Sequence, residues 1–365
     1  MPLDLFDLTA QLVDIRSESH HEDEITDWIE QRLATTASSL EVTRVGLNLV
    51  ARTQLGHPYR LIIAGHTDTV PINDNVPSRR DGDVLWGCGT SDMKSGVAVM
   101  LMLAQVVPEP RIDVTYVFYE AEEVEARFNG LKQLFELRPD LMAGDVALLG
   151  EPTDGVIEAG CQGTMRLRLV LRGARAHTAR PWKGRNAIHR LGSVLERLDS
   201  YVERRPVIDG CEYREALQAV NVTGGVAGNV VPDAVTLMIN HRFAPDRTPE
   251  EAVQHVRELL DGLIEDGDDF KLVDLSNGAA PSLQHPVLAT LISRNHLSIR
   301  AKLGWTDVAR FAEHGVPAAN FGPGDATIAH TKDEKVHRAP LEATFAALLD
   351  LLQHGTDPTD SANHH

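Results

Sequence analysis

Long apolar runs are missing from this 365-residue sequence. None approaches the roughly 18 to 20 residues that a membrane-spanning helix needs, so we expect no such helix. The N-terminal stretch MPLDLFDLTAQLVDIRS also lacks a basic segment ahead of its apolar residues. The spacing of Leu5, Leu8, Leu12 and Ile15 predicts an amphipathic helix there and not a signal peptide.

Cysteine is scarce as well. Cys88, Cys161 and Cys211 are far apart, odd in number and in no CxxC pair. A disulfide framework is therefore not expected, whereas a reducing compartment fits this cysteine usage. We expect a cytoplasmic protein.

Positive charge is in deficit. The chain has 35 Lys and Arg against 53 Asp and Glu, a formal net charge of −18. Nucleic acids and anionic membranes bind to basic faces, so neither is expected as a partner. A small anionic ligand is still compatible with this charge, because a few local arginines can override a negative surface.

Helix and strand patterns alternate in the first part of the chain. The run YRLIIAGH at 59–66 is almost continuously apolar, which is typical of a strand buried on both faces. Further strands are expected at 112–120 and 145–149, and helices at 4–16, 22–36, 93–106 and 130–138. This alternation predicts an α/β fold in which helices flank a mostly parallel mixed sheet.

The pattern changes near residue 163. Strands are expected at 165–173, 216–224, 234–243 and 269–275, and helices at 186–203 and 248–265. Their order, β-α-β-β-α-β, is that of a ferredoxin-like module. After residue 276 the α/β pattern returns, with the strand-like VPAANFG and a helix at 341–353. We therefore expect one domain of residues 1–163 and 276–365, and an inserted α+β domain of residues 164–275.

Acidic residues and a histidine follow two of the expected strands. His66 and Asp68 share one face of an extended segment, and a carboxylate often orients a zinc-ligating histidine. A hydrogen-bonded structural pair would give the same triplet. Glu151, in Gly150-Glu151-Pro152-Thr153, lies where an open α/β sheet binds its ligands.

Three further candidates each allow two interpretations. Asp92 lies in a glycine-rich segment that lacks the spacing of a phosphate-binding loop, and it could bridge two metals or cap a helix. In Glu120-Ala121-Glu122-Glu123, close acids indicate either an exposed loop or a metal ligand beside a general base. His330 could be a ligand or a surface residue.

Together these residues form a set of nitrogen and oxygen ligands without cysteine, which suits zinc, cobalt or manganese in a hydrolytic site. The motifs are HTD at 66–68, GCGTSDMKSG at 87–96, EE at 122–123, GEPT at 150–153 and the late His330. On these motifs the sequence resembles the M20 family of metallohydrolases over nearly its whole length. The resemblance implies a zinc-peptidase-like catalytic domain and an inserted ferredoxin-like domain that acts as lid and dimerisation domain.

The resemblance also implies a role for each residue. It implies five ligands for two metal ions. His66 and Glu151 would bind one ion, Glu123 and His330 would bind the other, and Asp92 would bridge the two. Asp68 would orient His66, and Glu122 would be the general base for a water activated by two metals. The implied cofactors are two zinc ions per subunit, with cobalt or manganese as alternatives.

Other stretches resemble the actinobacterial desuccinylases of this family, which act on N-succinyl-LL-2,6-diaminopimelate in lysine and diaminopimelate biosynthesis. Among these stretches are RAHTARPW at 175–182, GGVAGNVVPD at 224–233 and GWTDVARF at 304–311. The resemblance implies a homodimer in which His177 and Asn229 bind substrate in the opposite protomer, and a succinyl site of Arg242, Thr306 and Gly324. Better-studied desuccinylases have an Arg-Arg pair where this chain has Cys161-Gln162.

Three classes of function follow from this sequence. The first is a desuccinylase for a small anionic N-acyl amino acid. The second is another M20 deacylase or peptidase, such as an N-acetylornithine deacetylase, an aminoacylase or a dipeptidase. The third is a non-enzymatic metal-binding protein, against which Glu122 argues, because binding alone requires no general base.

Overall fold

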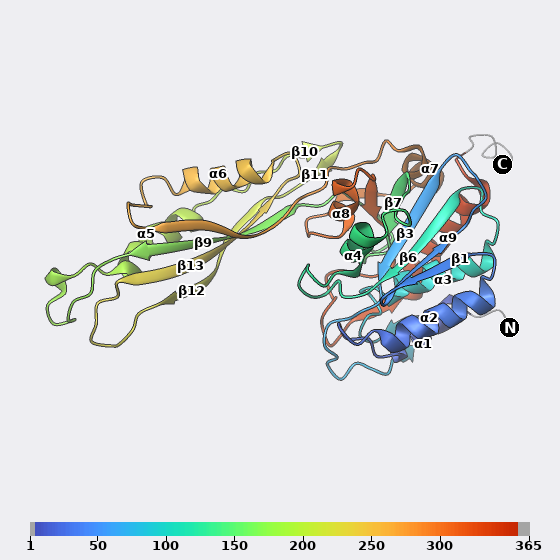
Figure 1. Cartoon of the computed structure of the whole chain (residues 1–365), viewed down its shortest axis with the longest axis horizontal. Helices are drawn as coiled ribbons and strands as arrows, with labels where there is room; N and C mark the ends of the chain where they lie inside the picture. The colour runs from blue at the N-terminus through green and yellow to red at the C-terminus, as the bar shows by residue number, and fades with distance from the viewer. Residues whose placement is uncertain (1–3, 357–365) are drawn as a thin grey trace. The chain divides into compact units, whose positions relative to one another are not determined.

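The computed structural model describes residues 4–356 (Figure 1). The final Asn-His-His triplet lies outside this range and has no part in the interpretation. Contacts between residues divide the chain into two compact units. The first consists of Met1–Ala159, Pro281–Arg300 and Arg310–His365, and the second of Gly160–Ala280 and Ala301–Ala309.

An eight-stranded mixed sheet forms the centre of the first unit (Figure 1). Its order is β1 (Glu41–Val45), β2 (Asn48–Arg52), β6 (Asp113–Tyr119), β3 (Arg60–His66), β7 (Val146–Leu149), β16 (Ala318–Asn320), β8 (Ile157–Ala159) and β15 (Ile299–Ala301). The four strands from β6 to β16 are mutually parallel, whereas β2 and β8 join them antiparallel. Every residue of β6 and β7 is buried, as expected for largely apolar strands in the middle of a parallel sheet.

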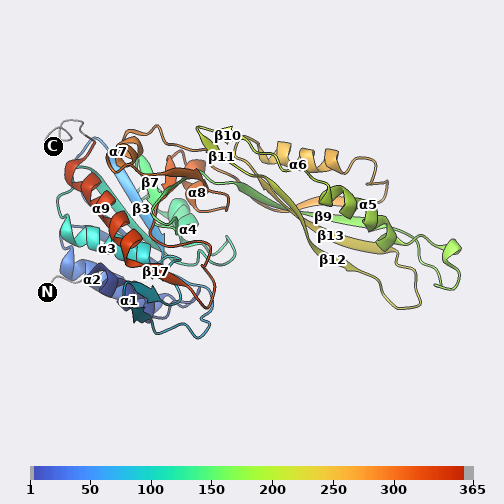
Figure 2. The ribbon, with the colours of Figure 1, turned by 180° about the vertical axis from the view of Figure 1, so that it is seen from behind.

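Helices cover this sheet on both faces (Figures 1 and 2). The helix α3 (Lys94–Val106) contacts β3 and β6, and α1 (Leu5–Asp14), α2 (Asp23–Thr36) and α9 (Arg338–His354) pack against α3. The sequence of α3 is apolar on all sides, and each of its residues from Lys94 to Ala104 is buried. On the other face α4 (Gly130–Leu137) contacts β2.

Shorter elements complete the chain. They are the sheet of β17 (Lys335–His337), β5 (Val84–Trp86) and β4 (Arg79–Asp81), the pair β10 (Val207–Ile208) and β11 (Cys211–Glu212), and the helices α7 (Pro286–Arg294), α8 (Val308–Glu313) and η1 (Pro181–Lys183). No helix within residues 4–356 has the length and apolar content to cross a membrane.

The second unit contains an antiparallel sheet with the order β12 (Ala216–Gly224), β13 (Ala234–Phe243), β9 (Gly163–Arg172) and β14 (Asp269–Ser276). With α5 (Ala187–Asp199) and α6 (Pro249–Leu259) this gives the ferredoxin-like order β-α-β-β-α-β. Buried and partly buried residues alternate along the whole of β13. One face of the sheet therefore packs on the two helices, in a core that includes Leu167, Leu237 and Val256.

The predicted α/β fold and the inserted module are confirmed, with corrections to some elements. The helix expected at 248–265 ends at Leu259, because the chain turns through Gly262, whose φ of 76° is left-handed. The helix expected at 186–203 ends at Asp199. The hairpin β1–β2 was not predicted, since its alternation is short and one of its strands is largely exposed.

A buried histidine in the second unit predicts acid sensitivity. His241 is fully buried in β13, and neither ring nitrogen has a hydrogen-bond partner among residues 4–356. Burial, with smaller contributions from His255 and Arg247, lowers its pKa from 6.5 to about 3. The unfolded chain therefore binds more protons below pH 6.5, and the stability present above that pH is lost as the pH falls, by up to about 1.4 kcal/mol per unit.

We expect His241→Leu to flatten the dependence of stability on pH between pH 6.5 and 4, because the titrating group is gone. Urea unfolding across this range, with His189→Gln of the exposed His189 as control, measures the effect. Equal slopes for His241→Leu and the control would contradict the prediction.

Candidate active site

The proposed catalytic residues of the first unit meet at the carboxyl ends of its parallel strands. His66 is the last residue of β3, the acidic loop Glu120–Glu123 follows β6, and Glu151 follows β7. The register of the three strands brings His66 opposite Tyr119 and Ala64 opposite Leu149. Three separate stretches of sequence therefore deliver polar side chains to one edge of the sheet.

Asp92 lies between two histidines. One carboxylate oxygen is 3.1 Å from His66 Nε2, and the other is 3.4 Å from His330 Nε2. His330 Nε2 is also 2.8 Å from Glu123 Oε1. The helix α3 begins with Met93 at its N-cap and has no side-chain cap. Asp92 therefore contacts both histidines and does not cap α3.

Three overlapping groups of residues each bring their ligand atoms within 4.8 Å of one another. The groups are His66, Asp92 and Glu151; His66, Glu122 and Glu123; and Asp92, Glu123 and His330. Each histidine has carboxylate oxygens around it. His66, Asp92 and Glu123 each belong to two of the three groups. This is the donor set that a pair of divalent cations with nitrogen and oxygen ligands requires.

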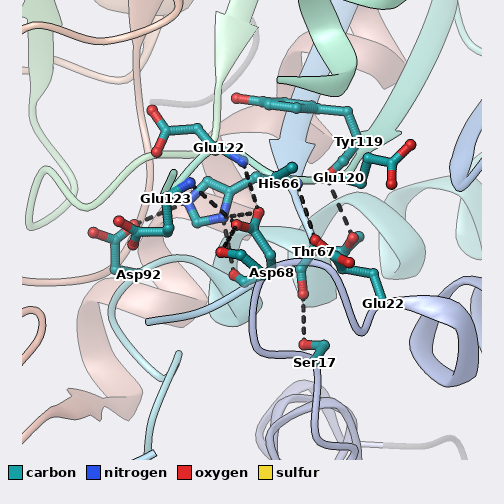
Figure 3. A network of polar contacts seen from close by, with 12 residues as sticks. Ser17, Glu22, His66, Thr67, Asp68, Asp92, Tyr119, Glu120, Glu122 and Glu123 are labelled. Atoms are coloured by element: carbon teal, nitrogen blue, oxygen red, sulfur yellow. Dashed lines mark hydrogen bonds and ion pairs between the residues drawn. The ribbon is translucent and has the colours of Figure 1, made fainter. Parts of the chain in front are cut away.

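Asp68 is the centre of the network drawn in Figure 3. Its oxygens accept hydrogen bonds from Glu122 N at 3.0 Å, Glu123 N at 3.1 Å and Ser19 Oγ at 2.6 Å. His66 Nδ1 lies 3.4 Å from Asp68 Oδ1 and 3.1 Å from its backbone oxygen. Asp68 therefore contacts both the ring of His66 and the backbone of the acidic loop, while the Glu122 carboxylate points away from it (Figure 3).

The electrostatics of the site suit a cation. Hydrogen bonds to Asp92 and Glu123 raise the pKa of His330 to about 10. Burial opposes the charge on His66, but hydrogen bonds to Asp68 and Asp92 outweigh it and raise the His66 pKa well above its ordinary value. The carboxylates that hold protons on these rings would hold divalent cations in the same way, with release of the protons. The residues present fit a two-metal centre.

The chain is similar to known proteins over most of its length. Residues 62–354 match peptidase family M20/M25/M40. The chain belongs to the M20 family. A protein of Mycobacterium tuberculosis, provisionally named a succinyl-diaminopimelate desuccinylase, is 51% identical over 350 residues, which cover 96% of this chain and 97% of the relative. The succinyl-diaminopimelate desuccinylase of Corynebacterium glutamicum is 45% identical, with 90% of each chain covered.

Solved structures of low sequence identity share the M20 fold. The aminopeptidase PepT of Bacillus cereus superposes with a TM-score of 0.77 at 20% identity, over 95% of this chain and 97% of that one. A dinuclear metal-binding peptidase of the M20 family from Bacillus subtilis gives a TM-score of 0.71 at 17% identity, with the same coverage.

Glycines let the backbones of this M20 site approach closely. A Cβ at Gly96 of α3 would collide with the carbonyl oxygen of Gly150, and one at Gly322 would collide with the backbone of Gly150 and Glu151. A Cβ at Gly324 would likewise meet the backbone of Ser91, next to Asp92. Glycine at these positions therefore serves close packing around the ligands. For Gly324 this is a structural reason that the sequence analysis did not identify.

The other residues predicted to bind substrate lie in the second unit. His177 and Asn229 are exposed, and they are close together because Thr178 N donates to Asn229 O. His177 Nδ1 accepts a hydrogen bond from Ala179 N, which leaves Nε2–H as the free donor of the neutral ring. Arg242 is opposite Thr164 in the pairing of β13 with β9, and Thr306 O accepts a hydrogen bond from the Cys161 thiol.

Cys161 and Gln162 have structural roles in the second unit. Both are buried. Besides the thiol contact with Thr306, Cys161 exchanges backbone hydrogen bonds with Ala279, and Gln162 Oε1 accepts from Arg214 N at 2.9 Å. The pair that departs from the Arg-Arg pattern therefore joins segments that are distant in the sequence.

Three buried residues at this site were not predicted from the sequence. Glu334 accepts hydrogen bonds from Ser91 N and Asp92 N, and Glu22 accepts one from Ala121 N. Lys94 Nζ donates to Ile15 O, and burial lowers its pKa to about 8. Lys94 and Glu334 stand close to Asp92 and His330 in sequence, which is a usable signal, but nothing near Glu22 points to Ala121.

Proposed function

We propose that this chain is a metal-dependent amide hydrolase that removes succinate from N-succinyl-LL-2,6-diaminopimelate, in lysine and diaminopimelate biosynthesis. The observation that carries the reaction is the convergence of two histidines and four carboxylates at one sheet edge. The identity to named desuccinylases over nearly the full chain supports the substrate. The three cysteines are free and buried, in keeping with a cytoplasmic enzyme.

The five ligands proposed for two cations are His66 and Glu151, Glu123 and His330, and the bridging Asp92. Zinc suits these ligands, and cobalt or manganese are the alternatives. When bound, such cations supply Lewis acidity to an amide carbonyl and make a water more acidic. The contacts of Asp92 with both histidines support its place as the bridge.

Glu122 is the proposed general base. Its carboxylate is partly exposed, whereas its backbone N–H is fixed by Asp68, so the side chain is held by its main chain and can reach a substrate. Glu122 would take a proton from the attacking water and deliver it to the leaving amine. Asp68 would keep the His66 ring in the orientation that ligation needs.

The succinyl carboxylate calls for a cationic partner and strong donors. Arg242 is half-buried, and burial together with the neighbouring Arg166 lowers its pKa, so an anionic partner would stabilise its charge. Thr306 Oγ1 is buried and has no hydrogen-bond partner among residues 4–356. We propose that Arg242, Thr306 and Gly324 bind the succinyl end of the substrate. The substrate is a small anionic N-acyl amino acid.

We also propose a homodimer in which His177 and Asn229 serve the partner's site. The strand β12 is an edge of its sheet, and Val220 and Val222 on it are 56% and 49% exposed. An exposed apolar edge strand is suited to pairing with a second copy. The free Nε2–H of His177 would donate to the developing oxyanion.

Glu122→Gln should keep its metal and lose on the order of 10² to 10⁴ in rate, because the amide cannot accept the proton. Glu123→Ala should lose about one metal equivalent, and a chelator should abolish wild-type activity. Metal analysis and steady-state kinetics on the purified variants test this. A fully active Glu122→Gln enzyme would overturn the assignment of the base.

Mixing Glu122→Gln with His177→Ala should restore part of the activity that each homodimer lacks. One site of each mixed dimer receives Glu122 from one chain and His177 from the other, both of them wild type. Activity is measured after subunit exchange, with exchange verified by differently tagged chains. Absence of recovery in verified mixed dimers would place His177 outside the partner's site.

The succinyl substrate should exceed its N-acetyl counterpart by at least about 10² in kcat/KM, because a site built for a carboxylate leaves its donors unsatisfied without one. Arg242→Ala should lower the ratio of the succinyl to the N-acetyl kcat/KM, because the succinyl carboxylate loses its cationic partner. A panel of N-succinyl and N-acetyl derivatives of diaminopimelate and ornithine measures it. Equal or better turnover of N-acetylornithine would favour another M20 deacylase, and no turnover at all would favour a metal-binding protein.

A further inference from the structure

Four consecutive backbone N–H groups of the acidic loop donate to side chains from three different elements. Glu120 N donates to Asn48 Oδ1 at 3.1 Å, and Ala121 N to Glu22 Oε1 at 3.1 Å. Glu122 N and Glu123 N donate to the two oxygens of Asp68. Figure 3 shows two of these acceptors, Glu22 and Asp68. Each residue of the loop is thus held by its main chain, while its side chain is left for other contacts.

Two of these acceptors depend on the short segment between α1 and α2. Glu22 precedes α2 and is fully buried, although its side chain does not cap that helix. Ser19 Oγ donates to Asp68 Oδ2 at 2.6 Å, and so supplies a third donor to the carboxylate that holds the loop. The segment is itself fixed, since Ser17 Oγ donates to Thr67 O and Ser19 N to Thr69 O.

The backbone at Ala121 needs such support. Its φ of 57° lies in the left-handed region, which residues with a Cβ adopt rarely. Ala121 is buried, so water cannot replace Glu22 as the acceptor for its N–H. Without that acceptor, the backbone at Ala121 would be expected to relax toward a right-handed conformation. This would turn the next residue, Glu122.

We infer that Glu22 and Ser19 are positioning residues for the general base: Glu22 fixes the turn at Ala121, and Ser19 fixes Asp68, which holds the backbone of Glu122. The inference rests on the proposed function of Glu122. Neither residue contacts the reacting atoms or a proposed metal ligand through its side chain. Their effect is expected in the orientation of the base and not in substrate binding.

The experiment compares Glu22→Ala, Glu22→Gln and Ser19→Ala with Glu24→Ala, an exposed acid of the same helix turn, as control. Amide hydrogen exchange of the loop Glu120–Glu123 is measured in the metal-free protein. Glu22→Ala should raise exchange there at least about tenfold above the control and leave the central strands protected. Glu22→Gln should remain close to wild type, because its amide oxygen still accepts from Ala121 N.

Kinetics then test the consequence for the base. With metal content unchanged, Glu22→Ala should lower kcat on N-succinyl-LL-diaminopimelate by about tenfold or more and leave KM within about threefold, because misplacement of a catalytic group impairs the chemical step. Glu22→Gln should recover most of this loss. Ser19→Ala, which removes one hydroxyl, should give a smaller loss of the same kind and serves as the test if Glu22→Ala does not fold.

Exchange and kcat equal to those of Glu24→Ala would overturn the inference. Loss of metal in proportion to the loss of rate would also overturn it, since Glu22 would then support ligands and not the base. The proposed function fails separately, if the wild-type enzyme hydrolyses no N-acyl amino acid. The exchange measurement needs neither metal nor substrate, and it still decides whether Glu22 holds the loop.

Discussion

Mutual repulsion among carboxylates that meet at one sheet edge is the constraint around which this site is organised. Four such groups contribute to the clustered ligand atoms: Asp92, Glu122, Glu123 and Glu151. The charge is compensated locally, because each histidine ring lies against at least two carboxylates and a buried lysine, Lys94, lies close by. Protons on the histidines and backbone N–H groups offset only part of the negative charge of the carboxylates. Divalent cations would offset the rest. The arrangement therefore makes physical sense as a metal site.

Close packing converts this charge cluster into a fixed geometry. The helix α3 reaches the end of β7 only because Gly96 and Gly150 have no Cβ, and the segment at Gly322 packs on the same backbone. Residues more than 50 positions apart in the sequence thereby share one small volume. The acidic loop is held through its backbone amides, since Glu122 N and Glu123 N both donate to Asp68.

Much of the fold could be predicted from sequence, because it depends on local patterns, and the candidate ligands were found through motifs that resemble the M20 family. Continuous apolar strands and the polar residues after them placed His66 and Glu151 at one edge before any contact was known. Glu22 could not be found in this way, since it meets Ala121 across 99 positions and its role depends on one backbone angle. The roles of Cys161 and Gln162 were equally hidden, because their contacts are with distant residues of their own unit.

The proposed metal ligands and the proposed substrate residues lie mostly in different units of the chain. The residues proposed for proton transfer and metal binding all lie in the first unit, and His66, Glu122, Glu123 and Glu151 stand at or just after the ends of strands that a parallel sheet fixes in register. Four of the five proposed substrate residues lie in the second unit: His177, Asn229, Arg242 and Thr306. Of these, Arg242 and Thr306 are proposed to contact the acyl group, whereas His177 is proposed to donate to the developing oxyanion. This arrangement is consistent with a fold that an aminopeptidase and a desuccinylase both use.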